Sequence, residues 1–472
     1  MSDDAHDPAS PVGALAEALL QALPTGSVLT DAASMEAYRR DRANDPDAGM
    51  PLAVVRATST EEVQAAVRFA AAHGIPIVPR GAGSGLSGGS SAVEGCIVVS
   101  LERMRAIEVH PETRMATVQP GAFNAEVKAA AAEHGLWYPP DPSSFEFCSI
   151  GGNVATNAGG LCCVKYGVTT DYVLGLTVVL ADGRAVRLGG ARVKDVAGLS
   201  LTKLFVGSEG TLGIITEIIL RLVPAQPVPA TLVATFADLG AASDAVVAIT
   251  RTTRPSMLEF MDRTTLGAVE DATRMGLDRD AAAMLVVQFD DHPGDATAAL
   301  EAVERACAAH GCTECYVTSD PEEGEALVTA RRMAIPALER RGALLLEDVG
   351  VPIPRLRDLV VGIERIAAAR AVTIAVIAHA GDGNTHPLLV LDPVDLEQQA
   401  RARVAYGEVM ELAISLGGTI TGEHGVGRLK QPWLADYLGD DVLELNQRIK
   451  DALDPGHLLN PGAVFALRGA AR

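Results

Sequence analysis

The sequence predicts an α+β protein organised in two parts. Strand-like and helix-like segments alternate from about residue 51, and a proline-bearing segment at 222–230 ends this first region. Beyond it, short apolar segments alternate with helical patterns, which predicts an antiparallel sheet backed by helices. The chain has 472 residues, of which 48% are hydrophobic. That is enough for two or three hydrophobic cores, at roughly 100 to 200 residues per domain.

The first region is expected to begin with an amphipathic helix over 10–23. A later helix is expected to have Thr60 as its N-cap, with Glu61 and Glu62 in its first turn and Gly74 as its stop. Strands are predicted over 52–57, 75–80, 93–101, 115–121, 174–183 and 184–188. In the second region the predicted strands are 231–236, 284–289 and 313–318, and the predicted helices are 240–252, 295–310 and 395–416.

The charge of the chain limits its partners. It carries 60 acidic and 39 basic side chains, which give a formal net charge of -21. A field of this sign disfavours nucleic acid and anionic membrane surfaces. No apolar run reaches the roughly 20 residues of a membrane-spanning helix, and the acidic start MSDDAHDPAS differs from a signal peptide. We therefore expect a cytoplasmic protein that does not bind nucleic acid.

Two histidines frame a short glycine-rich connection. His379 follows one apolar segment and His386 precedes another, and Gly-Asp-Gly-Asn at 381–384 lies between them. We expect two strands joined by a tight turn, with both rings directed toward one point. The alternative is a pair of hydrogen-bonded histidines at strand ends, without a metal.

A further imidazole and a carboxylate occur in Gly422-Glu423-His424-Gly425. In extended backbone the adjacent Glu423 and His424 side chains point opposite ways, so that one can bind a metal while the other acts as a base. Two imidazoles and one carboxylate form a ligand set that Zn, Mn or Fe(II) accepts, with positions left open for substrate.

Three glycine-rich segments, at 81–91, 150–160 and 207–215, adjoin apolar strand-like runs. Their backbone N–H groups can surround phosphate oxygens, and the missing Cβ atoms allow a close approach. The first segment has the spacing G-x-G-x-x-G from Gly83, but a strand is predicted after it, which excludes a nicotinamide-binding Rossmann fingerprint. Three such loops favour a long pyrophosphate-bearing cofactor over simple turns.

The order of these motifs resembles that of the FAD-linked 2-hydroxy-acid dehydrogenases. This family includes the flavin subunit of glycolate oxidase, D-lactate dehydrogenase and D-2-hydroxyglutarate dehydrogenase. The resemblance implies a vanillyl-alcohol-oxidase-type flavin fold, with a two-subdomain PCMH-type FAD-binding domain, a ferredoxin-like antiparallel α+β cap domain and a C-terminal helical segment that returns to the first domain. The matching segments cover nearly the whole chain and are 79–89, 139–144, 148–160, 204–217, 379–387, 422–430 and 453–462.

The domain bounds expected from this resemblance are 1–45 for an N-terminal helical segment, 46–225 for the FAD-binding domain, 226–425 for the cap with the metal site, and 426–472 for the C-terminal segment. The active site is then expected between the FAD-binding domain and the cap.

The resemblance also implies which residues bind the flavin. Some relatives attach the flavin to a histidine, but Ser84 stands at the corresponding position, so the FAD is expected to be noncovalent. Asn460 is expected to bring the chain end back to the flavin domain. The expected cofactor-binding residues are Pro79, Arg80, Gly81, Ala82, Gly83, Ser84, Gly85, Ser87, Pro140, Asp141, Ser143, Ser149, Gly152, Asn153, Ala155, Asn157, Gly159, Glu209, Gly213, Ile214 and Asn460.

By the same resemblance, His379, His386 and Glu423 match the family's ligands of a divalent metal (Zn, Mn or Fe), and His424 matches its base. Arg331 matches an arginine that holds the substrate carboxylate by bidentate pairing, with a solvated helix-face cation as the alternative. The implied reaction converts a D-2-hydroxy acid to the 2-keto acid. The metal lowers the hydroxyl pKa, His424 removes the proton, and a hydride passes to flavin N5.

Two departures from the family favour a small substrate. Glu347 and Leu388 stand where the 2-hydroxyglutarate enzyme has a lysine and an asparagine. A second substrate carboxylate would meet an acid and an apolar side chain, so glycolate or D-lactate is favoured. The alternatives are D-2-hydroxyglutarate and a flavin-binding subunit that needs partner subunits for activity. The paired histidine motifs disfavour a flavin enzyme for another alcohol, such as an alditol.

The seven cysteines suggest neither a disulfide framework nor an iron–sulfur cluster. Electrons must then leave to a separate acceptor, such as a quinone, a cytochrome or an electron-transfer flavoprotein. An iron–sulfur partner subunit and a homodimer are left open.

Overall fold

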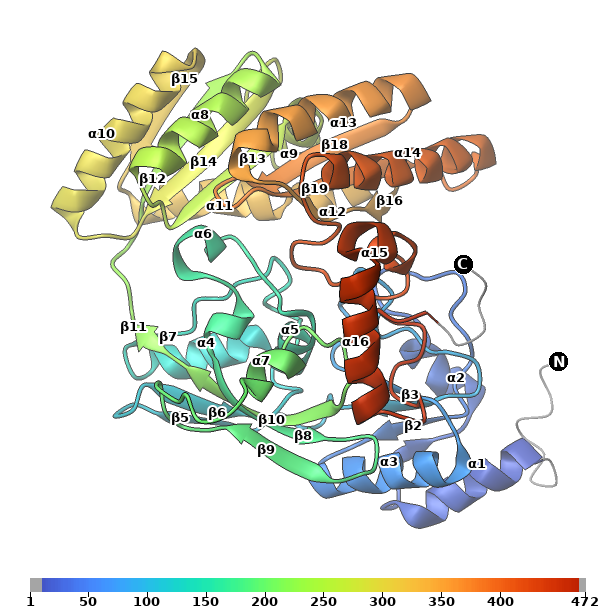
Figure 1. Cartoon of the computed structure of the whole chain (residues 1–472). Helices are drawn as coiled ribbons and strands as arrows, with labels where there is room; N and C mark the ends of the chain where they lie inside the picture. Colours follow the sequence, from blue (N-terminus) through green and yellow to red (C-terminus); the bar gives the residue numbers. More distant parts are fainter. Residues whose placement is uncertain (1–10, 467–472) are drawn as a thin grey trace. The chain divides into compact units, whose positions relative to one another are not determined.

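The computed structural model describes residues 11–466, which form two compact units (Figure 1). The first unit consists of residues 11–159, Val168–Ala225 and 423–466, and the second consists of Gly160–Gly167 and Gln226–Gly422. The expected metal residues are divided by this partition, because His379 and His386 belong to the second unit and Glu423 to the first.

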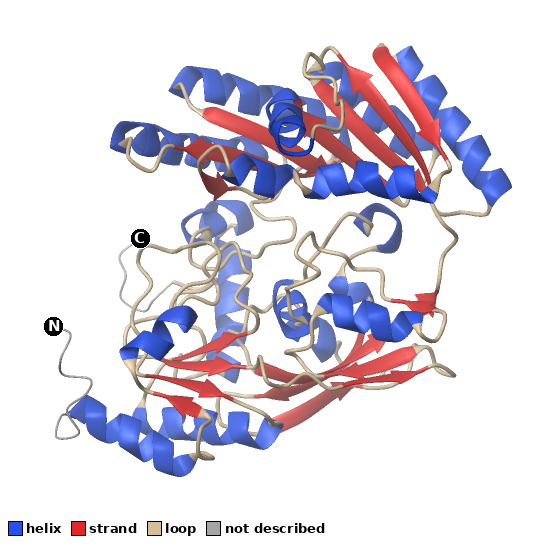
Figure 2. Ribbon diagram, turned by 180° about the vertical axis from the view of Figure 1, so that it is seen from behind, coloured by secondary structure: helices blue, strands red, loops and turns tan. Residues whose placement is uncertain are grey.

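Three sheets form the frame of the first unit (Figure 2). Its strands are β1 (Val28–Leu29), β2 (Ala53–Arg56), β3 (Ile77–Arg80), β4 (Ile97–Ser100), β5 (Ile107–His110), β6 (Met115–Val118), β7 (Leu136–Trp137), β8 (Val173–Val179), β9 (Ala185–Gly189), β10 (Ile214–Arg221) and β11 (Val223–Pro224). In the sheet β1-β2-β4-β3, strands β2, β3 and β4 are parallel and β1 is antiparallel. The sheet β5-β6-β10-β8-β9 is antiparallel throughout, and β7 pairs with β11.

The helices of the first unit lie around these sheets. They are α1 (Pro11–Ala22), α2 (Ala32–Met35), α3 (Thr60–His73), α4 (Asn124–Ala132), α5 (Ile150–Thr156), α7 (Leu201–Phe205), α15 (Gln431–Leu438) and α16 (Asp440–Leu453), with the short 3-10 helices η2 (Glu36–Tyr38) and η3 (Thr169–Asp171). The prediction of helix over 10–23 is confirmed from Pro11 to Ala22 and was one residue too long at Leu23, and residue 10 lies outside the described residues.

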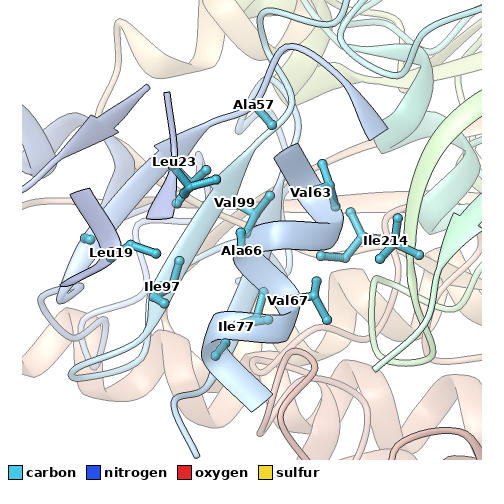
Figure 3. Packing of buried hydrophobic residues seen from close by; sticks show 14 of the residues in the cluster. Leu19, Leu23, Ala57, Val63, Ala66, Val67, Ile77, Ile97, Val99 and Ile214 are labelled. Atoms are coloured by element: carbon cyan, nitrogen blue, oxygen red, sulfur yellow. The ribbon is translucent and has the colours of Figure 1, made fainter. Parts of the chain in front are cut away.

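Helix α3 shows how sequence pattern becomes a core. Its apolar residues at helical spacing, including Val63, Ala66 and Val67, are all fully buried. Figure 3 shows them facing Ile77 and Val99 of the parallel strands. The predicted start of this helix was wrong by one residue, because the extended Ser59 is the cap and accepts a hydrogen bond from the N–H of Glu62. The predicted stop at Gly74 is confirmed by its left-handed conformation, with φ 66°.

Helix α5 was read from the sequence as part of a glycine-rich loop. Its two glycines disfavour a helix by about 1 kcal/mol each relative to alanine. Ser149 opposes this cost as N-cap, since its hydroxyl oxygen accepts the N–H of Gly152, and Asn157 ends the helix at φ 53°. Capping therefore offsets part of this cost.

One large antiparallel sheet organises the second unit. Its strands are β12 (Ala230–Phe236), β13 (Met257–Asp262), β14 (Ala283–Phe289), β15 (Cys312–Thr318), β16 (Ala343–Leu346), β17 (Val349–Gly350), β18 (Thr373–His379) and β19 (Asn384–Leu391). The order is β15-β12-β14-β13-β18-β19-β16, and β17 also pairs with β19. This is the antiparallel sheet predicted from the sequence.

Helices cover this sheet on both faces. They are α6 (Cys163–Tyr166), α8 (Leu239–Thr252), α9 (Arg263–Thr273), α10 (Pro293–Ala309), α11 (Pro321–Arg332), α12 (Ala334–Glu339), α13 (Leu356–Arg370) and α14 (Leu396–Ser415), with the 3-10 helix η4 (Ile353–Arg355). In Figure 1, α8, α10, α13 and α14 form one layer. Helices α9, α11 and α12 pack with the opposite sheet face in a core that includes Met261, Ile377 and Leu388.

Candidate active site

His379 and His386 lie on neighbouring strands, β18 and β19. Ile377 pairs with His386 and His379 pairs with Asn384, so the two histidines are diagonal neighbours on one sheet face. Their ring centroids are 5.1 Å apart, and one ring nitrogen of each lies within 4.8 Å of one from the other. The prediction of two strands that bring the rings together is confirmed.

The turn between these strands requires glycine. Gly383 has φ 86°, and a Cβ atom there would lie 2.2 Å from the carbonyl oxygen of Val351. Asp382 accepts a hydrogen bond of 3.0 Å from the N–H of Asn384. That contact supports the turn, as expected for aspartate in such a sequence.

A buried carboxylate joins His379 to Arg331. Glu259 faces His379 across the pair β13–β18, and 2.8 Å separates His379 Nδ1 from Glu259 Oε1. The other oxygen, Oε2, lies 2.8 Å from a terminal nitrogen of Arg331. Arg331 comes from the last turn of α11 and is only 2% exposed. The alternative of a solvated helix-face cation was therefore wrong.

A second buried carboxylate, Asp348, holds the chain just before Glu423. Its Oδ2 accepts hydrogen bonds from the Thr421 hydroxyl at 2.6 Å and the Gly422 N–H at 2.9 Å. Its Oδ1 lies 3.7 Å from His386 Nδ1. Sequence reasoning missed both Glu259 and Asp348, and the only available signal was a charged residue inside an otherwise apolar strand region.

The two residues used to argue for a small substrate are both fully buried. Leu388 packs in the core of the second unit. Glu347 forms a hydrogen bond with Tyr406. The pKa of the Tyr406 hydroxyl is raised mainly by burial, and also by the negative charge of Glu347 and by this hydrogen bond. Both residues therefore lie in the interior of the second unit.

Glu423 and His424 lie in a bent segment of the first unit. His424 Nε2 is 3.5 Å from Glu423 Oε1, so the two side chains approach each other. The expectation that they point opposite ways was wrong, because the backbone bends at 422–424 and is not extended. Glu423 follows Gly422 directly in the chain, so their Cα atoms are about 3.8 Å apart. The hydrogen bond from Gly422 to Asp348 therefore also restrains Glu423.

The first glycine-rich loop follows β3 and is closely packed at its first two glycines. A Cβ atom at Gly81 would lie 2.3 Å from Ser149 Oγ, and one at Gly83, where φ is 71°, would lie 2.1 Å from Arg80. The Arg80 guanidinium donates to the carbonyl oxygens of Ala37, Arg40 and Ser90. Arg80 thus holds the loop through carbonyl oxygens. Because these contacts do not use the N–H groups of the loop, those groups are suited to bind a phosphate-bearing cofactor.

All expected cofactor-binding residues belong to the first unit. Ser149 connects two of the expected segments, since its hydroxyl oxygen accepts the N–H groups of Ala82 and Gly152. Asn153 is buried and receives a hydrogen bond from Asn124, which also donates to the carbonyl oxygen of Pro140. The side chain of Ile214 packs in the core instead, so only its backbone is left to meet a cofactor.

Glu209 and Asn460 tie further loops to the same region. Asn460 donates to the carbonyl oxygens of Gly89 and Glu209. The carboxylate of Glu209 accepts hydrogen bonds from the N–H groups of Val426 and Gly427. The loop that carries His424 is thereby attached to the loops expected to hold the flavin.

Known families match both units. Residues 51–189 match an FAD binding domain, and residues 225–464 match the C-terminal domain of the FAD linked oxidases. The chain belongs to the FAD-linked oxidase family. It is 42% identical over 420 residues to glycolate oxidase subunit GlcD of Bacillus subtilis (strain 168), which covers 88% of this chain and 89% of that protein. It is 35% identical over 436 residues to a D-lactate dehydrogenase of Archaeoglobus fulgidus, covering 91% and 95%.

Solved structures show the same fold for this FAD-linked oxidase. A p-cresol methylhydroxylase has a TM-score of 0.81 at 18% identity, with 98% of both chains covered. A 4-ethylphenol oxidase from Gulosibacter chungangensis has a TM-score of 0.82 at 19% identity, also with 98% of both covered. The family, the PCMH-type α+β fold and the enzyme class expected from the motifs are confirmed. Among residues 11–466, no helix has the length and apolar composition needed to cross a membrane.

Proposed function

We propose that this FAD-linked oxidase oxidises a small D-2-hydroxy acid, glycolate or D-lactate, to the 2-keto acid with the help of a divalent metal. Two relatives named glycolate oxidase subunit GlcD and D-lactate dehydrogenase support this class of substrate. The observation that carries the proposal is that Glu259 joins His379 and Arg331 through its two carboxylate oxygens. A metal-ligand imidazole and a carboxylate-binding guanidinium are thus parts of one rigid array.

The donor set suits Zn, Mn or Fe. Glu259 engages Nδ1 of His379, which leaves Nε2 as the ligand atom and fixes the plane of the ring. The neighbouring ring of His386 supplies a second nitrogen, and Glu423 supplies the carboxylate through the chain that Asp348 holds at Gly422. A metal bound there would lower the pKa of a substrate hydroxyl.

Arg331 suits the substrate carboxylate. Its guanidinium is buried, and within residues 11–466 its Nε has no hydrogen-bond partner. A buried donor left unsatisfied costs about 1 to 3 kcal/mol, so a ligand that accepts from Nε relieves that cost. Nε and a terminal nitrogen together form the fork that pairs with both oxygens of a carboxylate. Glu259 holds this fork in place and balances its charge.

His424 is proposed as the base. One of its ring nitrogens takes the hydroxyl proton, while Ser87 fixes the backbone of His424 by donating to its carbonyl oxygen at 3.0 Å. FAD, when bound without a covalent link, supplies the acceptor for the substrate electrons. A monocarboxylate is proposed because Glu347 and Leu388 stand where the 2-hydroxyglutarate enzyme has a lysine and an asparagine.

The electrons are proposed to leave to a separate acceptor, such as a quinone, a cytochrome or an electron-transfer flavoprotein. Two relatives, from Bacillus subtilis and Escherichia coli, are named as subunits, which supports a partner subunit for this chain. We further propose a cytoplasmic location, in line with the acidic composition.

The test is anaerobic bleaching of the flavin band by a panel of D- and L-2-hydroxy acids that includes glycolate and D-2-hydroxyglutarate. We expect rapid bleaching by glycolate or D-lactate and slow bleaching by the L-enantiomer and the dicarboxylate. A flavin that stays oxidised with every acid, in protein that binds FAD and metal, would refute the proposed substrate class.

A further inference from the structure

Glu209 is a buried acid whose carboxylate contacts the chain just beyond His424. Its Oε1 lies 2.7 Å from the N–H of Val426, and its Oε2 lies 2.8 Å from the N–H of Gly427. Both oxygens are therefore committed to backbone donors two and three residues after His424. The carboxylate thus links its own loop to the segment that follows His424.

The backbone of Glu209 is fixed from both sides. Its N–H donates to the carbonyl oxygen of Ala155 at 2.8 Å, and its own carbonyl oxygen accepts the amide of Asn460 at 2.8 Å. The residue adopts φ 50°, a left-handed conformation that side-chain-bearing residues rarely occupy. Such a strained conformation persists only where surrounding contacts hold it, and here those contacts include both carboxylate oxygens.

The chain after His424 packs closely around this carboxylate. A Cβ atom at Gly425 would lie 2.9 Å from the Glu209 carboxyl carbon, and one at Gly427 would lie 2.0 Å from the carbonyl oxygen of Ser87. That same oxygen of Ser87 accepts the N–H groups of Arg428 and Leu429. The segment that follows His424 is thus held by Glu209 and by the first glycine-rich loop.

We propose that Glu209 is a positioning residue that fixes His424 for proton removal from the substrate. The inference rests on the proposed role of His424 as base. Two hydrogen bonds from backbone N–H groups to Glu209 hold the segment, and the Ser87 hydroxyl donates to the carbonyl oxygen of His424 itself. A displacement of about 1 Å at a reacting group can slow a reaction by about 100-fold, so this support matters for rate.

The test compares Glu209→Gln, His424→Ala and the double variant by single-turnover reduction of the bound flavin. The glutamine keeps the size of the side chain but replaces one acceptor oxygen by a donor that faces a backbone N–H. We expect Glu209→Gln to reduce its flavin about 10 to 100 times more slowly than the wild type, with an FAD dissociation constant within about twofold. If Glu209 acts through His424, the double variant is no slower than His424→Ala alone.

Amide hydrogen exchange gives a readout that does not depend on activity. The peptide that spans residues 424–430 should exchange faster in Glu209→Gln, while the rest of the first unit keeps its protection. The matched control is Asp262→Asn, the same chemical change at a buried acid that caps α9 by accepting the N–H of Thr265. Asparagine caps helices equally well, so this variant should keep the wild-type rate and exchange pattern.

The outcomes separate the two proposals. A normal rate in His424→Ala overturns the assignment of the base and the role of Glu209 together. If flavin reduction is slow in His424→Ala but normal in Glu209→Gln, only the positioning role is overturned. A double variant that reduces its flavin more slowly than both single variants also overturns only that role. If Glu209→Gln does not retain FAD, the same measurements are made on Glu209→Asp. Aspartate keeps the charge, but its side chain is too short to contact the N–H groups of Val426 and Gly427 in the same way. Loss of FAD from both variants would overturn the positioning role in favour of a purely structural one.

Discussion

Glu259 and His379 face each other across adjacent strands, with 2.8 Å between Glu259 Oε1 and His379 Nδ1. This contact fixes which ring nitrogen of His379 is available to a metal. Because Arg331 pairs with the other oxygen of Glu259, the same carboxylate couples the proposed metal ligand to the proposed carboxylate-binding residue.

Glu259→Gln should weaken metal binding by about 10 to 100-fold, the usual effect of losing a group that orients a ligand. The amide can still accept from His379, but it carries no charge to oppose Arg331. Competition with a chelator of known affinity measures the change. An unaltered metal affinity would show that Glu259 serves only to neutralise Arg331.

Arg331→Lys should raise the dissociation constant of the substrate by about 10 to 100-fold, since a lysine cannot form the two parallel hydrogen bonds of the guanidinium fork. FAD and metal content should not change. Arg332→Lys is the matched control, because Arg332 is the next residue on the same helix and pairs with Glu325 at the surface. Equal effects of the two substitutions would argue against a substrate contact.

His424→Ala should slow reduction of the flavin by about two to four orders of magnitude, the typical contribution of a general base. FAD binding should persist, which the visible absorption spectrum reports directly. His457→Ala removes an imidazole from the same unit, where it pairs with Asp451, and should leave the rate unchanged. Turnover at the wild-type rate in His424→Ala would remove this residue from the mechanism.

The pH dependence of stability should include a contribution from Glu209. Burial raises the pKa of its carboxyl from 4.5 to about 7, although the N–H groups of Val426 and Gly427 and the charges of Lys430 and Arg428 oppose this. Between these values the folded state binds a proton that the unfolded state has released, so the contribution of Glu209 to stability is greatest below pH 4.5 and falls as the pH rises through 7. The loss is about 3 kcal/mol for a shift of this size.

Glu209→Gln does not titrate, so its melting temperature should fall less than that of the wild type between pH 5 and pH 8. The net charge of the chain affects both proteins in nearly the same way and cancels in this comparison. If the melting temperatures of the wild type and Glu209→Gln change equally between pH 5 and pH 8, Glu209 keeps an ordinary pKa in the folded state.

Local sequence patterns predicted strands β18 and β19, the turn between them and the approach of His379 to His386. These features depend on residues that are close in the sequence and on Gly383, which the turn requires. The contacts of Glu259 and Asp348 could not be predicted in this way, since they join strands far apart in the sequence. Glu259 lies 120 positions from His379. A carboxylate in the middle of the largely apolar strand β13 was the one local sign of its role.

Two errors have the same physical origin. The directions of Glu423 and His424 were inferred from an extended backbone, whereas hydrogen bonds to Asp348 on one side and Glu209 on the other accompany a bend. The solvated alternative for Arg331 treated α11 as an exposed helix. Its inner face is buried with Val328 and Ala330, which only the tertiary structure reveals.

The measurement that tests the central claim most directly is anaerobic flavin bleaching by glycolate or D-lactate before chelation, after chelation, and after a divalent metal is added back. We predict rapid bleaching, its loss on chelation while FAD stays bound, and its return with the metal. Bleaching at the same rate in fully chelated protein would contradict a metal-assisted reaction at His379, His386 and Glu423.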